Sequence, residues 1–235
     1  MSIRSRNNKL LNALPSGDLS SIASQLEPIA LPRGEMLAST GNPIEHIYFL
    51  SDGIGSVFAR TPEGHTAEVG IFGYEGYIPS SAAVGSELSS YDIVVQVDAE
   101  GHRIGYESFR SAMQNNRHFA LVMVRAIETF AVQVAYTAVS NAVHDVNERL
   151  ARWLLMCDDR VVGDEIAITH DFLARMLAVR RPSVTTALHI LEGNGFIKSE
   201  RGLITMRNRV GLEEFAHDAY GRPEAEYRRL MADLF

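Results

Sequence analysis

The chain has 235 residues, of which 46% are hydrophobic and 22% charged, and its formal net charge is -7. This composition supplies enough apolar residues for one large or two ordinary cores, and it excludes an intrinsically disordered chain. The single cysteine, Cys157, excludes an internal disulfide and a multi-cysteine metal site built within one chain. So low a cysteine content fits a reducing cytoplasm.

No targeting or membrane-spanning segment is expected. The first residues, MSIRSRNNKLLNALPSGD, contain no continuous apolar region of the kind found in secretory signals. No continuous apolar run approaches the roughly 18 residues that suggest a membrane span. The sequence therefore predicts a soluble, cytoplasmic protein without a membrane partner.

The charges are unevenly distributed along the chain. Between residues 169 and 211, seven basic residues stand against three acidic ones, a local charge of +4 that leaves -11 for the rest. The seven are Arg175, Arg180, Arg181, Lys198, Arg201, Arg207 and Arg209. A basic region on an acidic body is compatible with DNA binding, because local charge matters more than net charge.

The first part of the chain predicts a helical opening followed by an antiparallel β domain. Residues 12–28 carry apolar residues at helical spacing, with Ser16 and Asp18 available as caps. Short β-rich runs follow, separated by turn-forming residues such as those at 51–53 and 99–101. The predicted strands are residues 46–50, 55–60, 67–72, 91–98 and 102–106. Such closely spaced short strands are typical of a sandwich or jelly roll.

A long helix is predicted after a short one over 109–115 that Ser108 caps. Residues 116–141 contain no Gly and no Pro, and their apolar residues recur at intervals of three and four, which predicts about seven helical turns. One face of this helix is expected to meet an identical helix and the other to cover the β domain; the alternative is that both pack within one chain. The expected dimer contacts are Phe119, Met123, Ala126, Phe130, Val134 and Thr137.

Beyond a domain boundary placed near residue 142, the pattern predicts a helix-turn-helix. An amphipathic helix over 146–156 comes first. Thr169 has the chemistry of an N-cap for a helix over 170–177. Pro182 then opens a second helix, where a missing backbone N–H costs nothing. Two such helices joined by a tight turn, with a buried Ala174 at their crossing, form a helix-turn-helix.

The residues around this motif predict contacts with DNA. A β-hairpin over 196–206, with Arg201 at its tip, forms a wing beside the second helix. Because a recognition helix enters the major groove N-terminus first, Arg181 is expected to contact guanine and Arg180 a phosphate. The other expected contacts are Ser183, Thr185, Thr186, Thr169, His170 and Arg201. The alternative is an ordinary helical hairpin with a solvated basic surface.

The stretch ITHDFLARMLAVRRPSVTTALHILEGNGFIKSERGLITM resembles the DNA-binding part of the Crp/Fnr superfamily of bacterial transcription regulators. PRGEMLASTGNPIEHIYFLSDGIGSVFA resembles that family's cyclic-nucleotide-binding-type β-roll. The resemblance covers almost the whole chain and implies an α+β fold. Its parts would be an antiparallel, jelly-roll-like sensory β-roll over 1–115, a dimerisation helix over 116–141, and a winged helix-turn-helix with a helical tail over 142–235.

The family resemblance also implies a function. It implies a homodimer that binds a near-palindromic double-stranded DNA operator, with RNA polymerase as a further partner if the protein activates transcription. The family's common base-reading pattern is Arg-Glu followed by a second basic residue. Arg181 matches the first position, but Pro182 replaces the Glu and Thr186 the later basic residue. Since Pro cannot accept a hydrogen bond from a cytosine amino group as Glu does, a different operator is expected.

Cyclic nucleotide binding is not expected. In ligand-binding members of the family, a Glu after Gly holds the ribose and an Arg about ten residues on pairs with the phosphate. Here Glu75 precedes Gly76, and residues 61–102 contain seven acids and no Lys or Arg. A buried phosphate without a cation would carry a large desolvation cost. The expected degenerate pocket, for another small ligand or for none, consists of Tyr74, Glu75, Gly76, Tyr77, Ser80, Ser81, Ser89 and Ser90.

Other sensors and other classes of protein have weaker support. An iron–sulfur cluster needs several cysteines, while eight histidines leave haem ligation open without a pattern that favours it. A metal-dependent β-roll enzyme of the cupin type needs clustered histidines, but His46, His65 and His102 are far apart in the sequence. No enzyme, metal or cofactor is therefore expected. A module that keeps the winged helix without binding DNA is the remaining alternative.

Overall fold

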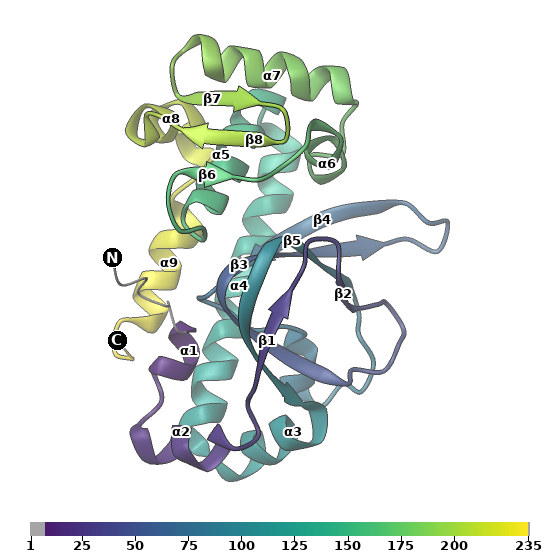
Figure 1. Ribbon diagram of the computed structural model, residues 1–235, viewed down its shortest axis with the longest axis vertical. Helices are drawn as coiled ribbons and strands as arrows, with labels where there is room; N and C mark the ends of the chain where they lie inside the picture. Colours follow the sequence, from purple (N-terminus) through teal and green to yellow (C-terminus); the bar gives the residue numbers. More distant parts are fainter. Residues whose placement is uncertain (1–7, 235) are drawn as a thin grey trace.

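The computed structural model describes residues 8–234, in which a β domain, one long helix and a second, mainly helical domain follow one another (Figure 1). Two short helices, α1 (Lys9–Asn12) and α2 (Ser16–Ala23), come first. The strands are β1 (Glu27–Leu31), β2 (Met36–Ala38), β3 (His46–Arg60), β4 (Thr66–Phe72) and β5 (Asp92–Gly105). All pairings are antiparallel, in the order β1-β5-β3-β4 with β2 also on β5. The predicted antiparallel β domain is confirmed.

Two of the predicted turns lie inside long strands. Residues 51–53 belong to β3 and residues 99–101 to β5, and the register pairs Leu50 with Gly101 across the two strands. A β-carbon on Gly101 would lie 2.2 Å from the backbone oxygen of Phe49. The prediction of turns was wrong here. These residues lie where the register between β3 and β5 is irregular and the two backbones approach closely, and such a stretch also requires Gly.

The helix predicted over 12–28 was too long and its caps were misassigned. The helix α2 ends at Ala23 and β1 begins at Glu27. Pro15 precedes the helix, and no side chain caps it. Asp18 has a different role, since its Oδ2 lies 2.8 Å from Nδ1 of His118 at the start of the long helix.

The long helix α4 (Arg117–Val143) confirms the prediction over 116–141. It follows α3 (Tyr106–Asn115), which begins after Gly105 and not at Ser108. Asn116 caps α4 by accepting a hydrogen bond from the backbone N–H of Phe119. At the predicted bend, Asp145 caps α5 (Val146–Asp158) in a capping box with Glu148, which accepts from the Asp145 N–H at 3.0 Å.

The second domain contains the predicted helix-turn-helix and wing. After α5 come β6 (Glu165–Ile166), α6 (His170–Met176), α7 (Arg181–Gly193), β7 (Ile197–Glu200), β8 (Leu203–Met206), α8 (Arg209–Ala216), the 3-10 turn η2 (His217–Ala219) and α9 (Arg222–Met231). The hairpin β7–β8 is the predicted wing. Strand β6, only two residues long, pairs with β8 and was too short to predict.

One of the hydrophobic clusters joins the two domains. Eight consecutive residues of α5, from Leu150 to Cys157, are buried, so this helix is not amphipathic as expected. Helices α7 and α8 pack against it, and Ile54, Phe58 and Ile71 of the sheet belong to the same cluster. The face of the β-sheet therefore buries one side of α5.

The C-terminal helix returns to the β domain. Helix α9 lies beside α4 (Figure 1), and Met231 is buried in the cluster that contains Phe119 and Met123. Arg125 of α4 donates to the backbone oxygen of Leu230 at 3.2 Å and pairs with Asp233. The tail thus ties the second domain to the long helix of its own chain.

Candidate nucleic-acid interface and interdomain cavity

The helix-turn-helix forms as its local sequence predicts. Thr169 caps α6 by accepting a hydrogen bond from the N–H of Phe172 at 3.3 Å. In the turn, Ala178 adopts a left-handed conformation with φ of 50°. Val184 of α7 is fully buried against the core. Ala174 is only partly buried, in contrast to the prediction, because it lies at the margin of the cluster.

The N-terminal end of α7 is exposed. Arg180, Arg181, Pro182, Ser183 and Thr186 are all accessible, and α7 lies at the end of the molecule opposite α2 and α3 (Figure 1). The Arg181 side chain is 64% exposed, with its Nε 3.3 Å from Oδ1 of Asp171. Such an exposed ion pair contributes little stability and can open when a stronger anionic partner arrives.

The hydroxyl groups near the start of α7 are engaged within the protein. Thr185 Oγ1 donates to the backbone oxygen of Arg181 at 3.3 Å, and Thr186 Oγ1 donates to that of Pro182 at 3.1 Å. His170 Nδ1 also lies 3.2 Å from Thr185 Oγ1. Both threonine hydroxyl groups therefore make hydrogen bonds within the protein, and the methyl groups are the parts of these side chains that do not.

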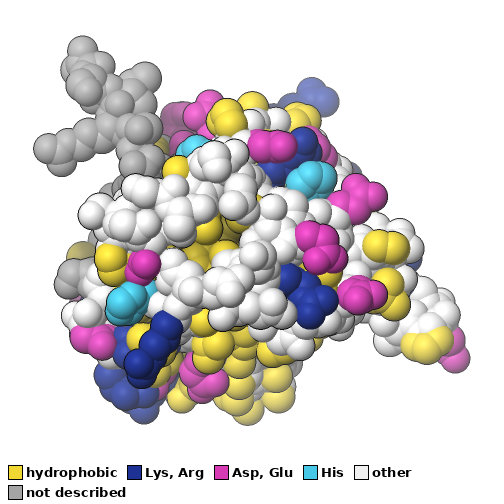
Figure 2. Space-filling model, turned by 90° about the horizontal axis from the view of Figure 1, so that it is seen from below, with side chains coloured by type: hydrophobic (Ala, Val, Ile, Leu, Met, Phe, Trp, Pro, Cys, Tyr) yellow, Lys and Arg dark blue, Asp and Glu magenta, His cyan; other side chains and the backbone are white. Residues whose placement is uncertain are grey.

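The wing is fixed beside α7. Glu192, near the end of α7, accepts a hydrogen bond from the backbone N–H of Ser199 in β7 at 2.9 Å. Arg201 is exposed at the tip of the hairpin. At the opposite end of the molecule, basic and acidic side chains are interspersed (Figure 2). The helix-turn-helix and its wing thus bring the predicted contact residues to one end.

A cavity of about 520 Å³ lies between the two domains. Five of the predicted pocket residues line it: Tyr74, Glu75, Gly76, Tyr77 and Ser80. The other three, Ser81, Ser89 and Ser90, do not line it. The hydroxyl of the buried Ser89 donates instead to the backbone oxygen of Tyr91 at 2.7 Å. The remaining walls come from α1, α4, the end of α5, α8 and α9.

The expectation that no cation serves this region was wrong. Arg160, directly after α5, donates from Nε to Oε1 of Glu75 at 2.7 Å and from Nη1 to the backbone oxygen of Met156 at 2.6 Å. Burial disfavours its charged form, but Glu75 and Asp159 outweigh that cost and raise the pKa of Arg160. Sequence reasoning missed Arg160 because it lies 85 residues from Glu75.

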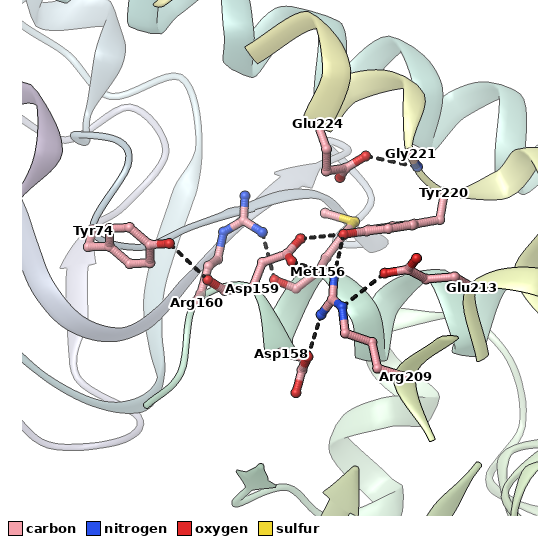
Figure 3. A network of polar contacts seen from close by, with 10 residues as sticks. All are labelled: Tyr74, Met156, Asp158, Asp159, Arg160, Arg209, Glu213, Tyr220, Gly221 and Glu224. Carbon is pink, nitrogen blue, oxygen red and sulfur yellow. Dashed lines mark hydrogen bonds and ion pairs between the residues drawn. The ribbon is translucent and has the colours of Figure 1, made fainter. Parts of the chain in front are cut away.

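A polar network holds the end of α5 to the start of α8 (Figure 3). Arg209 donates to Asp159 Oδ1 at 2.7 Å and to Glu213 Oε1 at 2.9 Å, and it also pairs with Asp158. The Tyr220 hydroxyl donates to Asp159 Oδ2 at 2.7 Å. The β domain joins this network through Tyr74, whose hydroxyl donates to the backbone oxygen of Asp159 at 3.1 Å.

A buried carboxyl group also bridges the domains. Glu68 of β4 accepts a hydrogen bond on Oε1 from the indole N–H of Trp153 in α5 at 2.9 Å. Burial raises the pKa of Glu68 to about 8, against the lowering effect of hydrogen bonds from Ser56 and Trp153. The carboxyl is therefore mainly protonated at neutral pH.

The predicted dimer contacts on α4 differ in how far their own chain buries them. Phe119, Met123 and Ala126 are buried inside their own chain, and Phe130, Val134 and Thr137 are partly buried. Phe119, Met123 and Ala126 belong to the cluster that also contains Ile47 and Phe49 of the β domain. An exposed row, here called the α4 stripe, consists of Leu121, Val124, Glu128, Ala131, Ala135 and Ala138.

By length and composition, α4 could also cross a membrane, the one such helix among residues 8–234, and 28% of its most apolar window is buried. The expectation that no segment reaches such a length holds only for continuous apolar runs. Within the same residues, no three His, Cys, Asp or Glu side chains are grouped closely enough to hold a metal ion.

Comparison with protein families assigns both domains. Residues 28–116 match the cyclic nucleotide-binding domain, and residues 148–215 match the Crp-like helix-turn-helix domain. The chain belongs to the Crp/Fnr family of transcription regulators. This membership confirms the family resemblance and the α+β fold class, and it makes the chain a Crp-like regulator with a helix-turn-helix DNA-binding domain. The family is one of transcription regulators and not of enzymes.

Individual members of the Crp/Fnr family are distant in sequence. The "CRP-like cAMP-activated global transcriptional regulator" of Mycobacterium tuberculosis is 22% identical over 191 residues, which cover 77% of this chain and 84% of that protein. FixK2 from Bradyrhizobium japonicum matches with a TM-score of 0.68 at 16% identity, over 80% of this chain and 96% of FixK2. A Crp/Fnr regulator from Eubacterium rectale matches with a TM-score of 0.65 at 20% identity, over 88% and 97%. These structures show a shared fold.

Proposed function

We propose that this Crp/Fnr regulator binds a near-palindromic DNA operator as a homodimer and does so without cAMP. The observation that carries the proposal is the exposed N-terminal end of α7, with Arg180 and Arg181 beside an accessible wing. A recognition helix of this kind places its first turns in the major groove. Arg181 would read a guanine, while Arg180, Thr169, His170, Ser183 and Arg201 would position the protein on the backbone.

The α4 stripe supports the homodimer. Its six residues follow one another at alternating intervals of three and four, the spacing of a coiled-coil contact. Three of the six are alanines, which let two helices approach closely. A lipid-facing surface would carry no charge at its centre, whereas Glu128 lies in the middle of the stripe. A second copy of α4 therefore fits this surface better than lipid does.

A dimer joined along α4 would present two copies of α7 to one side of a DNA duplex. Half-sites would then lie roughly 34–36 Å apart, which is one DNA turn. The two-fold symmetry of the protein requires two-fold symmetry in the operator. RNA polymerase would be a further partner if the dimer activates transcription.

The charges of the interdomain cavity favour independence from cAMP. Its buried cation, Arg160, is already paired with Glu75. The cavity lining also contains the cations Lys9, Arg209 and Arg228 and the acids Asp159, Glu213 and Glu224. Of these cations, Arg209 is paired with Asp158, Asp159 and Glu213. A cyclic phosphate that displaced Glu75 from Arg160 would leave that carboxylate unpaired in a largely buried site, which is costly.

The direct test is selection of bound fragments from a genomic DNA library by the purified full-length protein, without ligand and at moderate salt. Recovery of a two-fold-symmetric site, together with a dimer in sedimentation analysis, is the expected result. Operator affinity should be the same with and without cAMP. A site that is recovered only with cAMP would contradict the ligand part of the proposal, and failure to enrich any sequence would contradict DNA recognition itself.

A further inference from the structure

The face of α7 that points away from the protein can be located from its buried residues. Val184, Ala187, Leu188 and Leu191 lie against the core. At about 100° per residue, the direction opposite their mean falls on Pro182, Thr186 and His189. All three are exposed. We call Pro182, Thr186 and His189 the α7 face, and it is the part of the helix that would enter deepest into a DNA groove.

The first turns of the α7 face are apolar. Pro182 has no backbone N–H and offers only ring carbons. The Thr186 hydroxyl donates to the Pro182 backbone oxygen at 3.1 Å, so its O–H group is hydrogen-bonded within the helix. The Thr186 γ-methyl and the Pro182 ring, one turn apart, remain to contact a partner. Arg181 lies at the edge of this face, beside Asp171 of α6.

If Pro182 and Thr186 enter the major groove, the only apolar group on the base edges that they can contact is the 5-methyl of thymine. Hydrogen-bond donors and acceptors mark the other positions, and the 5-methyl of thymine is the apolar feature there. A threonine methyl packs favourably on it. The hydroxyl of Thr186 would have to leave its helix-internal bond before it could read a polar base edge instead.

We infer that Pro182 and Thr186 recognise the 5-methyl group of a thymine in each half-site, which makes Thr186 a specificity-determining residue. This inference rests on the proposed function, since it requires an operator. The inference names the chemical group, a thymine methyl, that the protein recognises at one base pair of each half-site. Arg181 reads a neighbouring base pair from the edge of the same helix.

The test uses the selected operator and the full-length dimer. Each thymine of a half-site is replaced in turn by deoxyuridine, which lacks only the 5-methyl group. One substitution should weaken binding about fourfold, the effect of one buried methyl group, while the others leave the Kd unchanged. At that position, cytosine paired with guanine should bind weakly, and 5-methylcytosine should restore about fourfold of the loss.

Two variants of Thr186 separate the methyl from the hydroxyl. Thr186→Val keeps a methyl and loses the hydroxyl, so it should still distinguish thymine from deoxyuridine. Thr186→Ser keeps the hydroxyl and loses the methyl, so it should lose most of the preference for thymine, and only the contact with the Pro182 ring would remain. Both changes lie on an exposed face, and circular dichroism would verify the fold. Ile190→Ala, exposed on α7 outside the α7 face and without a proposed DNA contact, serves as the control that leaves the thymine preference intact.

The outcomes are distinguishable. Discrimination by wild type and Thr186→Val, with its loss in Thr186→Ser, supports the inference. Indifference of the wild type to every deoxyuridine overturns the inference alone, because a specific operator would still be bound. Retention of discrimination by Thr186→Ser and its loss in Thr186→Val would assign reading to the hydroxyl and also overturn it. If no specific site is selected, the proposed function fails and the inference falls with it.

Discussion

The α7 end and the interdomain junction use the same residue type in opposite ways. Arg181 has a 64% exposed side chain and a weak partner in Asp171. Arg160 has a 9% exposed side chain and is held by Glu75 and the backbone of Met156. An exposed guanidinium can exchange its partner for DNA, whereas a buried one cannot leave without a large cost. The comparison separates a surface built for contact from a junction built for rigidity.

The largest expected effect is on the junction. Arg160→Ala leaves the Glu75 carboxylate without its cation in a largely buried site, so the free energy of unfolding should fall by about 3–5 kcal/mol. The exposed Arg180→Ala is the matched control and should change it by less than about 0.5 kcal/mol. Urea unfolding at one fixed protein concentration measures both. Equal effects of the two substitutions would break the comparison.

The next effect concerns the α4 stripe. Ala135→Glu places a long charged side chain where the small alanine lets the two helices approach closely, so dimerisation should weaken by about 3 kcal/mol. Asn141→Glu, exposed on the same helix outside the stripe, should have little effect. Sedimentation velocity over a range of concentrations gives the dissociation constants. A dimer that persists in Ala135→Glu would place the subunit contact on another surface.

The junction should also respond to pH through Glu68. Its pKa is raised from 4.5 to about 8, so the protonated form is favoured in the folded protein. The stabilisation that protonation gives is fully present below the unfolded pKa and is lost as the pH rises through about 8. Unfolding free energy should fall by about 2–3 kcal/mol between about pH 5.5 and pH 7.5.

The variant Glu68→Gln isolates this contribution. An amide keeps the acceptor for the Trp153 indole N–H but does not titrate. The two proteins should therefore have similar pH-independent stability at acid pH, and the wild type should become the less stable of the two as the pH rises. Urea unfolding at several pH values measures the slope. Parallel profiles of the two proteins would show that Glu68 is ionised in the folded state over the whole range.

Arg181→Ala tests the α7 end. It should weaken operator binding by about 1–3 kcal/mol and relax specificity at one base pair. Stability should not change, because the pair with Asp171 is exposed. Competition with operators substituted at each position measures the specificity. A uniform loss on all sequences would instead make Arg181 a phosphate contact, the role expected for Arg180.

The smallest effect is local. Thr169→Ala removes the cap that accepts the Phe172 N–H, and it should cost about 1 kcal/mol of stability. Thr169→Ser keeps the hydroxyl and should retain most of it. Thermal unfolding of both variants measures the difference. If the two were equally destabilised, packing of the γ-methyl and not the cap would be the cause.

Features that neighbouring residues determine could be predicted from the sequence. The predicted cap at Thr169 depends on a hydrogen bond to a residue only three positions away. The wing and the long helix α4 follow from turn chemistry and apolar spacing in the same way. The family resemblance was visible because such local signals occur along most of the chain.

Features that depend on distant segments could not be predicted. The turns expected at 51–53 and 99–101 lie opposite each other inside a sheet, and only the register reveals why Gly101 is needed. The two faces of α4 looked equivalent in sequence, and packing against the β domain decided which one stays exposed. Local sequence patterns do not indicate which of two apolar helix faces packs against the β domain.

The sequence by itself determined the helix-turn-helix, the basic residues at the start of its second helix and the succession of domains, because hydrogen bonds and periodicity within a few residues specify them. Tertiary structure alone decided the cation of the interdomain cavity, since Arg160 meets Glu75 across 85 residues. It also decided the burial that raises the pKa of Glu68 and the exposure of the α4 stripe. Burial and charge pairing are set by surroundings that the chain assembles only when it folds.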